Sequence, residues 1–243
     1  MKVQSLILLL FFALTAVAQV PRHEEWDALL REHVHNDGWV NYGGFTRDSA
    51  RLKTYLDGLS RQIPQTNWTG EDAMAYWINA YNAFTVLLVL RHPGIQSIKD
   101  IAPSPGKAGS PWDLPFIKLE GRPYTLNAVE HDHLRKLFPD PRIHAALVCA
   151  ALSCPRLHNR AYEGSRLNEQ LTDLSRAFLA DTLRNVIGQR KARLSMIFQW
   201  YAADFGGEDG VKHFLKNYGP VAVLPNEYSI RYLEYDWSLN GDF

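Results

Sequence analysis

Both cysteines of the chain fall in one short segment that also contains a histidine. Cys149 and Cys154 are five positions apart, and His144 precedes Cys149 by five positions. A thiol becomes a nucleophile when an imidazole or another cationic group lowers its pKa. Cys149 is therefore the candidate nucleophile and His144 the candidate general base and acid. Two buried structural thiols and a disulfide are the alternative interpretations of the same pattern.

The geometry of an extended chain limits these interpretations. In a β-strand, His144 and Cys149 would point to opposite faces because their separation is odd, so a bulge or bend is needed to bring them together. A disulfide would require the Ala-Ala-Leu-Ser link between Cys149 and Cys154 to reverse sharply. We therefore expect both thiols to be free. The C-x4-C spacing, with no further cysteine in the sequence, does not fit a zinc site.

A second cluster of titratable residues spans Asn127–Arg135. Asn127 followed three positions later by Glu130 is typical of a capping box, which gives Glu130 a structural role. Alternatively, Glu130 is the carboxylate that orients the His144 imidazole. The two histidines of the cluster are two positions apart and would diverge by about 200° on a helix, so we expect neither a metal site nor another cofactor.

Two asparagines, Asn79 and Asn82, interrupt the stretch Ala73–Leu90, which is otherwise apolar and carries no formal charge. Their spacing places both amides on one face of a helix. A buried amide without a partner costs about 1–3 kcal/mol, so each must bond either to loop backbone or to groups of a site. We predict that both point toward the Cys149 segment and line or support one cleft there.

The remaining candidates would contact the substrate. Asn82 or Arg142 is placed to donate hydrogen bonds to an oxyanion or to a substrate carboxylate. The expected catalytic residues are Cys149, His144 and Glu130. The expected substrate-binding residues are Asn79, Asn82, Arg142 and Cys154.

The elements that must position these residues are mostly helices. Apolar periodicity predicts helices over residues 21–35, 46–59, 69–92, 127–138, 167–183, 195–205 and 211–218. Extended segments are expected at 39–42, 143–149 and 228–237, and hairpins at 116–126 and 186–194. For residues 143–149 a helical turn is the alternative to a strand. The expected fold is α+β, a mostly helical single domain with a small antiparallel sheet.

The first 18 residues have the features of a secretory signal peptide. Lys2 precedes the apolar run Leu6–Val17, and Ala16-Val17-Ala18 supplies a small-x-small cleavage pattern. The run is too short to span the ~30 Å hydrocarbon core of a bilayer. We expect cleavage near Ala18, an exported protein that is periplasmic or secreted, and a single domain over residues 19–243.

Composition excludes several classes of protein. The 26 basic and 26 acidic side chains give no formal net charge, which argues against binding to a nucleic-acid backbone. With 46% hydrophobic residues the chain can form a sizeable core, so wholesale disorder is excluded. The two asparagines in Ala73–Leu90 argue for a core helix there, so we expect no membrane span in the mature chain.

Three motifs together resemble the family of domain of unknown function 547, DUF547. They are Ala75–Phe84, Asn127–Arg135 and Asp140–Pro155, and the resemblance covers roughly residues 70–205. It implies a papain- or transglutaminase-like architecture, in which a helix precedes a strand that carries a histidine. Here that helix carries Asn79 and Asn82 but no cysteine. Either the nucleophile has moved to Cys149 or Cys154, or the hydrolase chemistry has been lost.

These observations predict a thiol-dependent hydrolase or acyl-transferase that acts on an amide, isopeptide or thioester bond outside the cytoplasm. The alternative is a non-catalytic module that binds peptides or cell-envelope glycans. A peptide or a cell-envelope component is the expected partner in either case.

Overall fold

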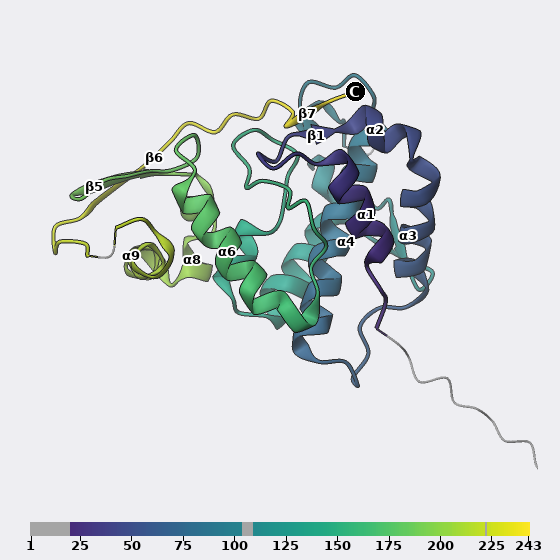
Figure 1. The fold of residues 1–243 in the computed structure, drawn as a ribbon, viewed down its shortest axis with the longest axis horizontal. Coiled ribbons are helices and arrows are strands. Elements are labelled where there is room, and N and C mark those ends of the chain that lie inside the picture. Colours follow the sequence, from purple (N-terminus) through teal and green to yellow (C-terminus); the bar gives the residue numbers. More distant parts are fainter. Residues whose placement is uncertain (1–19, 104–108, 222) are drawn as a thin grey trace, which may run out of the picture.

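A computed structural model describes residues 20–103, 109–221 and 223–243 of the chain (Figure 1). Helices dominate, and small sheets lie between them, so the predicted α+β class is confirmed. The expected signal peptide lies outside the described residues.

The helices and the strands are each numbered in chain order. The α-helices are α1 (Glu24–His33), α2 (Tyr42–Arg47), α3 (Ser49–Arg61), α4 (Gly70–Leu90), α5 (Arg135–Leu137), α6 (Leu167–Ala180), α7 (Ile197–Trp200), α8 (Ala202–Phe205) and α9 (Gly207–Tyr218). The strands are β1 (Val40–Asn41), β2 (Ile117–Leu119), β3 (Arg122–Tyr124), β4 (Val186–Ile187), β5 (Lys191–Leu194), β6 (Ser229–Tyr232) and β7 (Gly241–Asp242). A π-helical stretch, Ala128–Leu134, precedes α5, and a 3₁₀ turn, Pro141–Ala145, follows it.

Helix α4 is the centre of the main core. It begins after Thr69, whose side-chain oxygen accepts a hydrogen bond from the Asp72 amide and so caps the helix. Every residue from Met74 to Val86 is buried. The helix is long and apolar enough to cross a membrane, but 83% of its most apolar window is buried inside the fold. Helices α2 and α3 contact it, and α1 packs on both of them (Figure 1).

A second apolar cluster lies at the other side of the molecule. It joins α6, α7, α8 and α9 to β5 through buried aromatic side chains such as Phe178, Phe198 and Phe214. The chain after β6 then crosses the top of the view in Figure 1 and returns to the first half of the molecule, where β7 pairs with β1.

This return gives the sheets a topology that differs from the predicted one. The hairpins β2–β3 and β4–β5 are antiparallel, as expected. However, β1 pairs with β7 and β5 pairs with β6 in parallel orientation. A parallel pair needs a long connection between its strands, and the periodicity of the sequence does not show which distant segments meet.

Three local predictions are wrong. Residues 143–149 form the 3₁₀ turn and an irregular segment, not a strand, which leaves the helical turn as the better alternative. Thr46 does not begin a helix: it lies inside α2, which Asn41 caps by accepting from the Gly44 amide. The predicted helix over 195–205 is two short helices, α7 and α8.

The predicted capping box at Asn127 also does not form. Thr125 accepts the hydrogen bond from the Ala128 amide instead, and the Asn127 side chain donates to Asp113. Glu130 therefore has no capping role. It lies in the π-helical stretch, a geometry that is frequent at functional sites.

Candidate functional site

A cavity of about 210 Å³ contains both cysteines, and we call it the thiol cavity. Cys149, Cys154, His144 and Glu130 all line it. They come from the irregular segment after the 3₁₀ turn, from the turn itself and from the π-helical stretch. Neither Asn79, Asn82 nor Arg142 is among the lining residues.

The two cysteines face one another across a sharp reversal of the chain. Ala150 adopts a left-handed conformation with φ of +57°, and the Cys154 amide donates to the Ala151 carbonyl at 3.0 Å. Both thiols are free, as expected, but their Sγ atoms are only 2.8 Å apart. The Tyr235 hydroxyl lies 3.1 Å from Cys149 Sγ. The Ala-Ala-Leu-Ser link between the two cysteines thus makes the sharp reversal that brings the two sulfur atoms together.

The hydrogen bonds of this pair favour Cys154 over Cys149 as the thiol that ionises first. Burial acts to raise the pKa of Cys154, but bonds from the Cys149 thiol and amide, together with Tyr235 and Arg184, outweigh it and lower the pKa. Burial and the bond to Cys154 raise the pKa of Cys149 well above its usual value. The two thiols therefore titrate as one pair, and the first proton leaves Cys154.

The His144 ring is hydrogen-bonded to Asp204, a residue with no recognisable sequence motif around it. Nε2 of His144 lies 2.7 Å from Asp204 Oδ2, and Arg135 binds both carboxylate oxygens of Asp204. The bond to Arg135 is the largest cause that lowers the pKa of Asp204, so Asp204 is ionised and can only accept. The proton must then be on Nε2, which leaves Nδ1 as the basic nitrogen.

Burial keeps this imidazole neutral. It lowers the pKa of His144 and outweighs the opposing effects of Asp204 and Glu130. The ring stacks on Tyr201 with their centroids 4.1 Å apart. His144 is thus a fixed, uncharged base at the wall of the thiol cavity. The sequence suggests Glu130 as the carboxylate that orients this ring. In the structure the carboxylate bonded to the ring is that of Asp204.

Glu130 has different surroundings. Its side chain is buried, with 5% of the residue exposed, yet it makes no ion pair with any residue that the structure describes. The Tyr201 hydroxyl is its polar neighbour: burial, and then the charge of Glu130 and a hydrogen bond to it, raise the pKa of Tyr201.

The two asparagines organise backbone outside the cavity. Asn82 donates to the Ala146 carbonyl at 2.9 Å and accepts from the Val148 amide at 3.1 Å. The Asn82 amide thus makes hydrogen bonds with residues 143–149 that a neighbouring β-strand would otherwise make. Asn79 makes the same pair of bonds with Tyr162. Asn82 supports the Cys149 segment directly, whereas Asn79 supports a different loop.

Arg142 also points to structural partners. Its guanidinium pairs with Asp140 and reaches the side chains of Asn168 and Thr172 on α6. These bonds attach the 3₁₀ turn to α6, which accounts for the position of Arg142 away from the cavity.

Comparison with known families gives one match within the chain. A family described as protein of unknown function, DUF547, matches residues 65–179. The chain contains a DUF547 family domain. No curated protein and no solved structure matches the chain.

The DUF547 match includes α4, Glu130, His144 and both cysteines, but not the whole thiol cavity. The remaining lining comes from α7, from the residue that follows it and from the chain after β6. Six aromatic residues line the cavity: Tyr81, Trp112, Trp200, Tyr201, Tyr235 and Trp237. Asp204 also lies outside the match. The alternation of Tyr235 and Trp237 is the one signal in the sequence for part of this wall.

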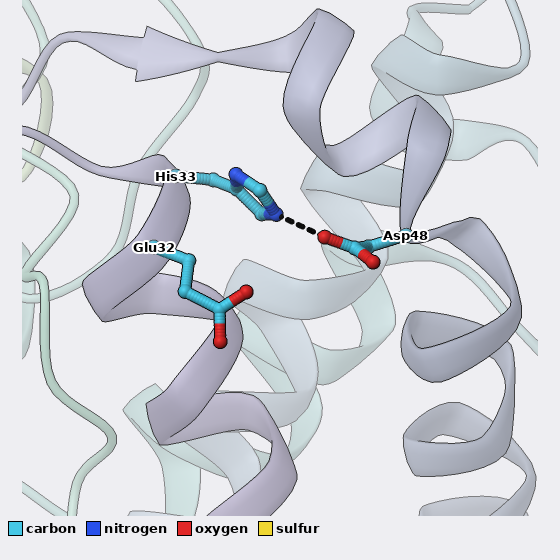
Figure 2. A group of neighbouring side chains, drawn as sticks. All are labelled: Glu32, His33 and Asp48. Atoms are coloured by element: carbon cyan, nitrogen blue, oxygen red, sulfur yellow. Dashed lines mark hydrogen bonds and ion pairs between the residues drawn. The ribbon is translucent and has the colours of Figure 1, made fainter.

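One group of side chains before the DUF547 domain has the composition of a metal site. Figure 2 shows Glu32, His33 and Asp48, whose possible ligand atoms lie within 4.8 Å of one another. His33 Nε2 is bonded to Asp48 at 2.7 Å. Arg51 donates to Glu32 at 2.7 Å and lies 3.6 Å from Asp48. This guanidinium already supplies the positive charge that a metal ion would bring, so the group is an ion-pair network.

A second cavity, of about 300 Å³, lies behind the cysteine segment, and we call it the arginine cavity. Its lining includes Arg156, Arg184 and Asp181. Asp181 receives both guanidinium groups, at 2.9 and 2.5 Å, and Arg184 also donates to the Cys154 carbonyl. The larger cavity of the two therefore has charges that are paired within the protein.

Proposed function

We propose that this protein is a thiol-dependent hydrolase or acyl-transferase acting on an amide, isopeptide or thioester bond. The observation that carries the proposal is the presence of a bonded thiol pair and a neutral histidine in one cavity. A thiol nucleophile needs a nearby group to take its proton, and a second step needs a base for the incoming water or acceptor.

In the acylation step the pair exchanges one proton. The Cys154 thiolate accepts the proton of Cys149 along their 2.8 Å contact. The Cys149 sulfur then attacks the carbonyl carbon, and the bond to the leaving group breaks. The leaving group takes the proton from Cys154, which restores the thiolate and leaves a thioester on Cys149. The Cys149 sulfur is assigned the attack because Cys149 is the more exposed residue of the two.

In the second step His144 acts as base and then as acid. Nδ1 takes a proton from water, or from an acceptor amine or alcohol, as that molecule attacks the thioester. The Cys149 sulfur leaves and recovers its proton from His144. Asp204 keeps the ring in the required tautomer and stabilises its charged form, in the way that the third member of a catalytic triad does.

The test is acylation by a generic activated ester. Protein treated with p-nitrophenyl acetate and analysed by intact mass spectrometry should carry one acetyl group on Cys149. The Cys149→Ser variant should carry none. His144→Gln should accumulate more adduct than the unmodified sequence, because deacylation slows while acylation continues. Alkylation under denaturing conditions controls for the integrity of both thiols.

The aromatic lining supports a second candidate, the binding of a peptide or glycan without chemistry, because aromatic rings are common in ligand pockets. No acetyl adduct on a native protein whose thiols react after denaturation would contradict the enzyme and favour this module.

Export is proposed from the N-terminal sequence alone. The pattern that ends at Ala18 supports a mature chain that begins at Gln19 in the periplasm or outside the cell. Mass spectrometry of protein from the native host tests this, and an N-terminus at Met1 would contradict it.

A further inference from the structure

The charges that line the thiol cavity are unbalanced. No lysine or arginine is among its lining residues in the part of the chain that the structure describes, whereas the Glu130 carboxylate is. The Arg135 guanidinium bonds both oxygens of Asp204, so these two groups balance one another. Buried charges in proteins are normally paired. A positively charged ligand would pair with Glu130.

Aromatic rings with electron-rich faces line the same cavity. Trp200 stacks on Trp237 with centroids 5.7 Å apart, and Tyr235 lies 4.6 Å from Trp237 and 4.8 Å from Trp200. Trp112 lies 5.9 Å from Trp237 on another side. The face of an aromatic ring attracts cations, tryptophan most strongly.

Two rings of this lining already hold a cation from the chain itself. The Lys99 ammonium lies 4.5 Å from the centroid of Trp237, and the Arg135 guanidinium lies 5.0 Å from that of Tyr201. Neither cation is among the residues that line the cavity. The rings therefore bind cations in this protein, and the cavity side of the wall has no such partner among the described residues.

We propose that the thiol cavity binds a quaternary or methylated ammonium group, held between the Glu130 carboxylate and the tryptophan and tyrosine rings. A methylated ammonium is favoured over a primary one because it needs no hydrogen bonds and loses little hydration on entering an aromatic site. The volume of about 210 Å³ accommodates a group the size of choline. Where the proposed thiol chemistry holds, the ammonium belongs to the substrate whose carbonyl carbon Cys149 attacks.

The test compares choline with its uncharged isostere, 3,3-dimethylbutan-1-ol. Titration of the full chain, followed by calorimetry and tryptophan fluorescence, should show that choline binds at least about tenfold more tightly than the alcohol, since only the charge differs. Equal binding of the two probes would mean an apolar site and overturn the proposal. No binding of choline at millimolar concentration would also overturn it.

Variants locate the binding. Glu130→Gln and Trp200→Ala should each weaken choline binding about tenfold or more. Trp200 is 47% exposed, so its removal leaves the fold intact. Trp39→Ala is the matched control, because this tryptophan is also partly exposed but bonds to Asp242 outside the cavity. Choline binding that Trp39→Ala weakens as much as Trp200→Ala does would place the ligand elsewhere.

The Cys149→Ser variant separates this proposal from the proposed function. It should bind choline as the unmodified protein does, while it fails to form the acetyl adduct. Choline binding without any adduct in the native protein would contradict the enzyme and leave the ammonium site standing. An adduct without choline binding would contradict the ammonium site and leave the proposed enzyme standing.

Discussion

The two cavities on either side of the cysteine segment differ in how their charges are satisfied. His144 lines the thiol cavity and the next residue, Ala145, lines the arginine cavity, so adjacent residues of the chain line the two cavities. In the arginine cavity Asp181 is 7% exposed and holds two guanidinium groups. In the thiol cavity Glu130 is as deeply buried and has no ion pair within the described residues.

The difference shows that size alone does not identify a functional site. The arginine cavity is the larger, but its charges hold α6, the loop after it and the cysteine segment together. The thiol cavity is smaller and contains the Glu130 carboxylate, which forms no ion pair with any residue that the structure describes. A buried charge whose partners are all present cannot be removed without leaving those partners unpaired, whereas one without a partner is available to a ligand.

The largest expected effect is the loss of Asp181. Asp181→Ala leaves Arg184 buried without its carboxylate and also removes the acceptor of the Leu183 amide. Breaking a buried ion pair from one side costs about 3–5 kcal/mol in the free energy of unfolding. Urea denaturation measures this. Arg156→Ala is the control: it removes the more exposed partner of Asp181 and should cost about 1 kcal/mol or less. Equal losses of unfolding free energy in Asp181→Ala and Arg156→Ala would contradict the difference between the buried and the exposed partner of Asp181.

The next effect concerns the asparagine that supports the thiol cavity from behind. Asn82→Ala leaves the Ala146 carbonyl and the Val148 amide without partners, so stability should fall by about 1–3 kcal/mol. Asn79→Ala is a matched control with the same pair of bonds to Tyr162. Both variants should lose stability, but only Asn82→Ala should change the rate at which iodoacetamide alkylates Cys149. An effect of Asn79→Ala on that rate would contradict the separate roles.

The elements that could be predicted from the sequence are those with a local cause. Helices α4 and α6 and the hairpins β2–β3 and β4–β5 follow from apolar periodicity and turn residues. Residues 143–149 have an apolar pattern that matches a strand, but their backbone bonds are made by the side chain of Asn82 from α4. A side chain that replaces a strand leaves no periodic signal.

The site divides in the same way. His144, both cysteines and Glu130 are identifiable because residue types that do chemistry cluster in the sequence. Asp204 is not, because it lies 60 positions after His144 in a short helix with no motif around it. The aromatic wall escapes prediction for a similar reason: tryptophan and tyrosine are normal core residues, and only the fold brings these six to one cavity.

The hydrogen bond between Cys149 and Cys154 should have a smaller effect, on the pH dependence of thiol alkylation. The pKa of Cys154 is lowered by its hydrogen bonds, so the pair forms a thiolate at a pH below that of an ordinary cysteine. In Cys154→Ala only Cys149 remains, and burial keeps its pKa high. Alkylation should therefore shift to higher pH, and at neutral pH it should slow about tenfold for each unit of that shift. Cys149→Ala should shift less, because the backbone amide of residue 149 still donates to Cys154. Intact mass spectrometry across a pH series measures both, and an unchanged profile in Cys154→Ala would contradict the shared charge.

The smallest expected effect on stability is that of removing the Glu130 charge. Glu130→Gln keeps the shape of the side chain, breaks no ion pair and keeps an oxygen that can accept from Tyr201, so the free energy of unfolding should change by about 1 kcal/mol or less. Removing a buried carboxylate that has no cationic partner also removes its desolvation cost, so a slight gain is the expected direction. The isosteric Asp181→Asn, measured in the same denaturation series, should instead lose stability because the buried Arg184 guanidinium loses its carboxylate partner. If Glu130→Gln were as destabilising as Asp181→Asn, Glu130 would have a structural role like that of Asp181, and the contrast between the two cavities would fail. With stability unchanged and choline binding lost, the Glu130 charge would be a feature of ligand binding alone.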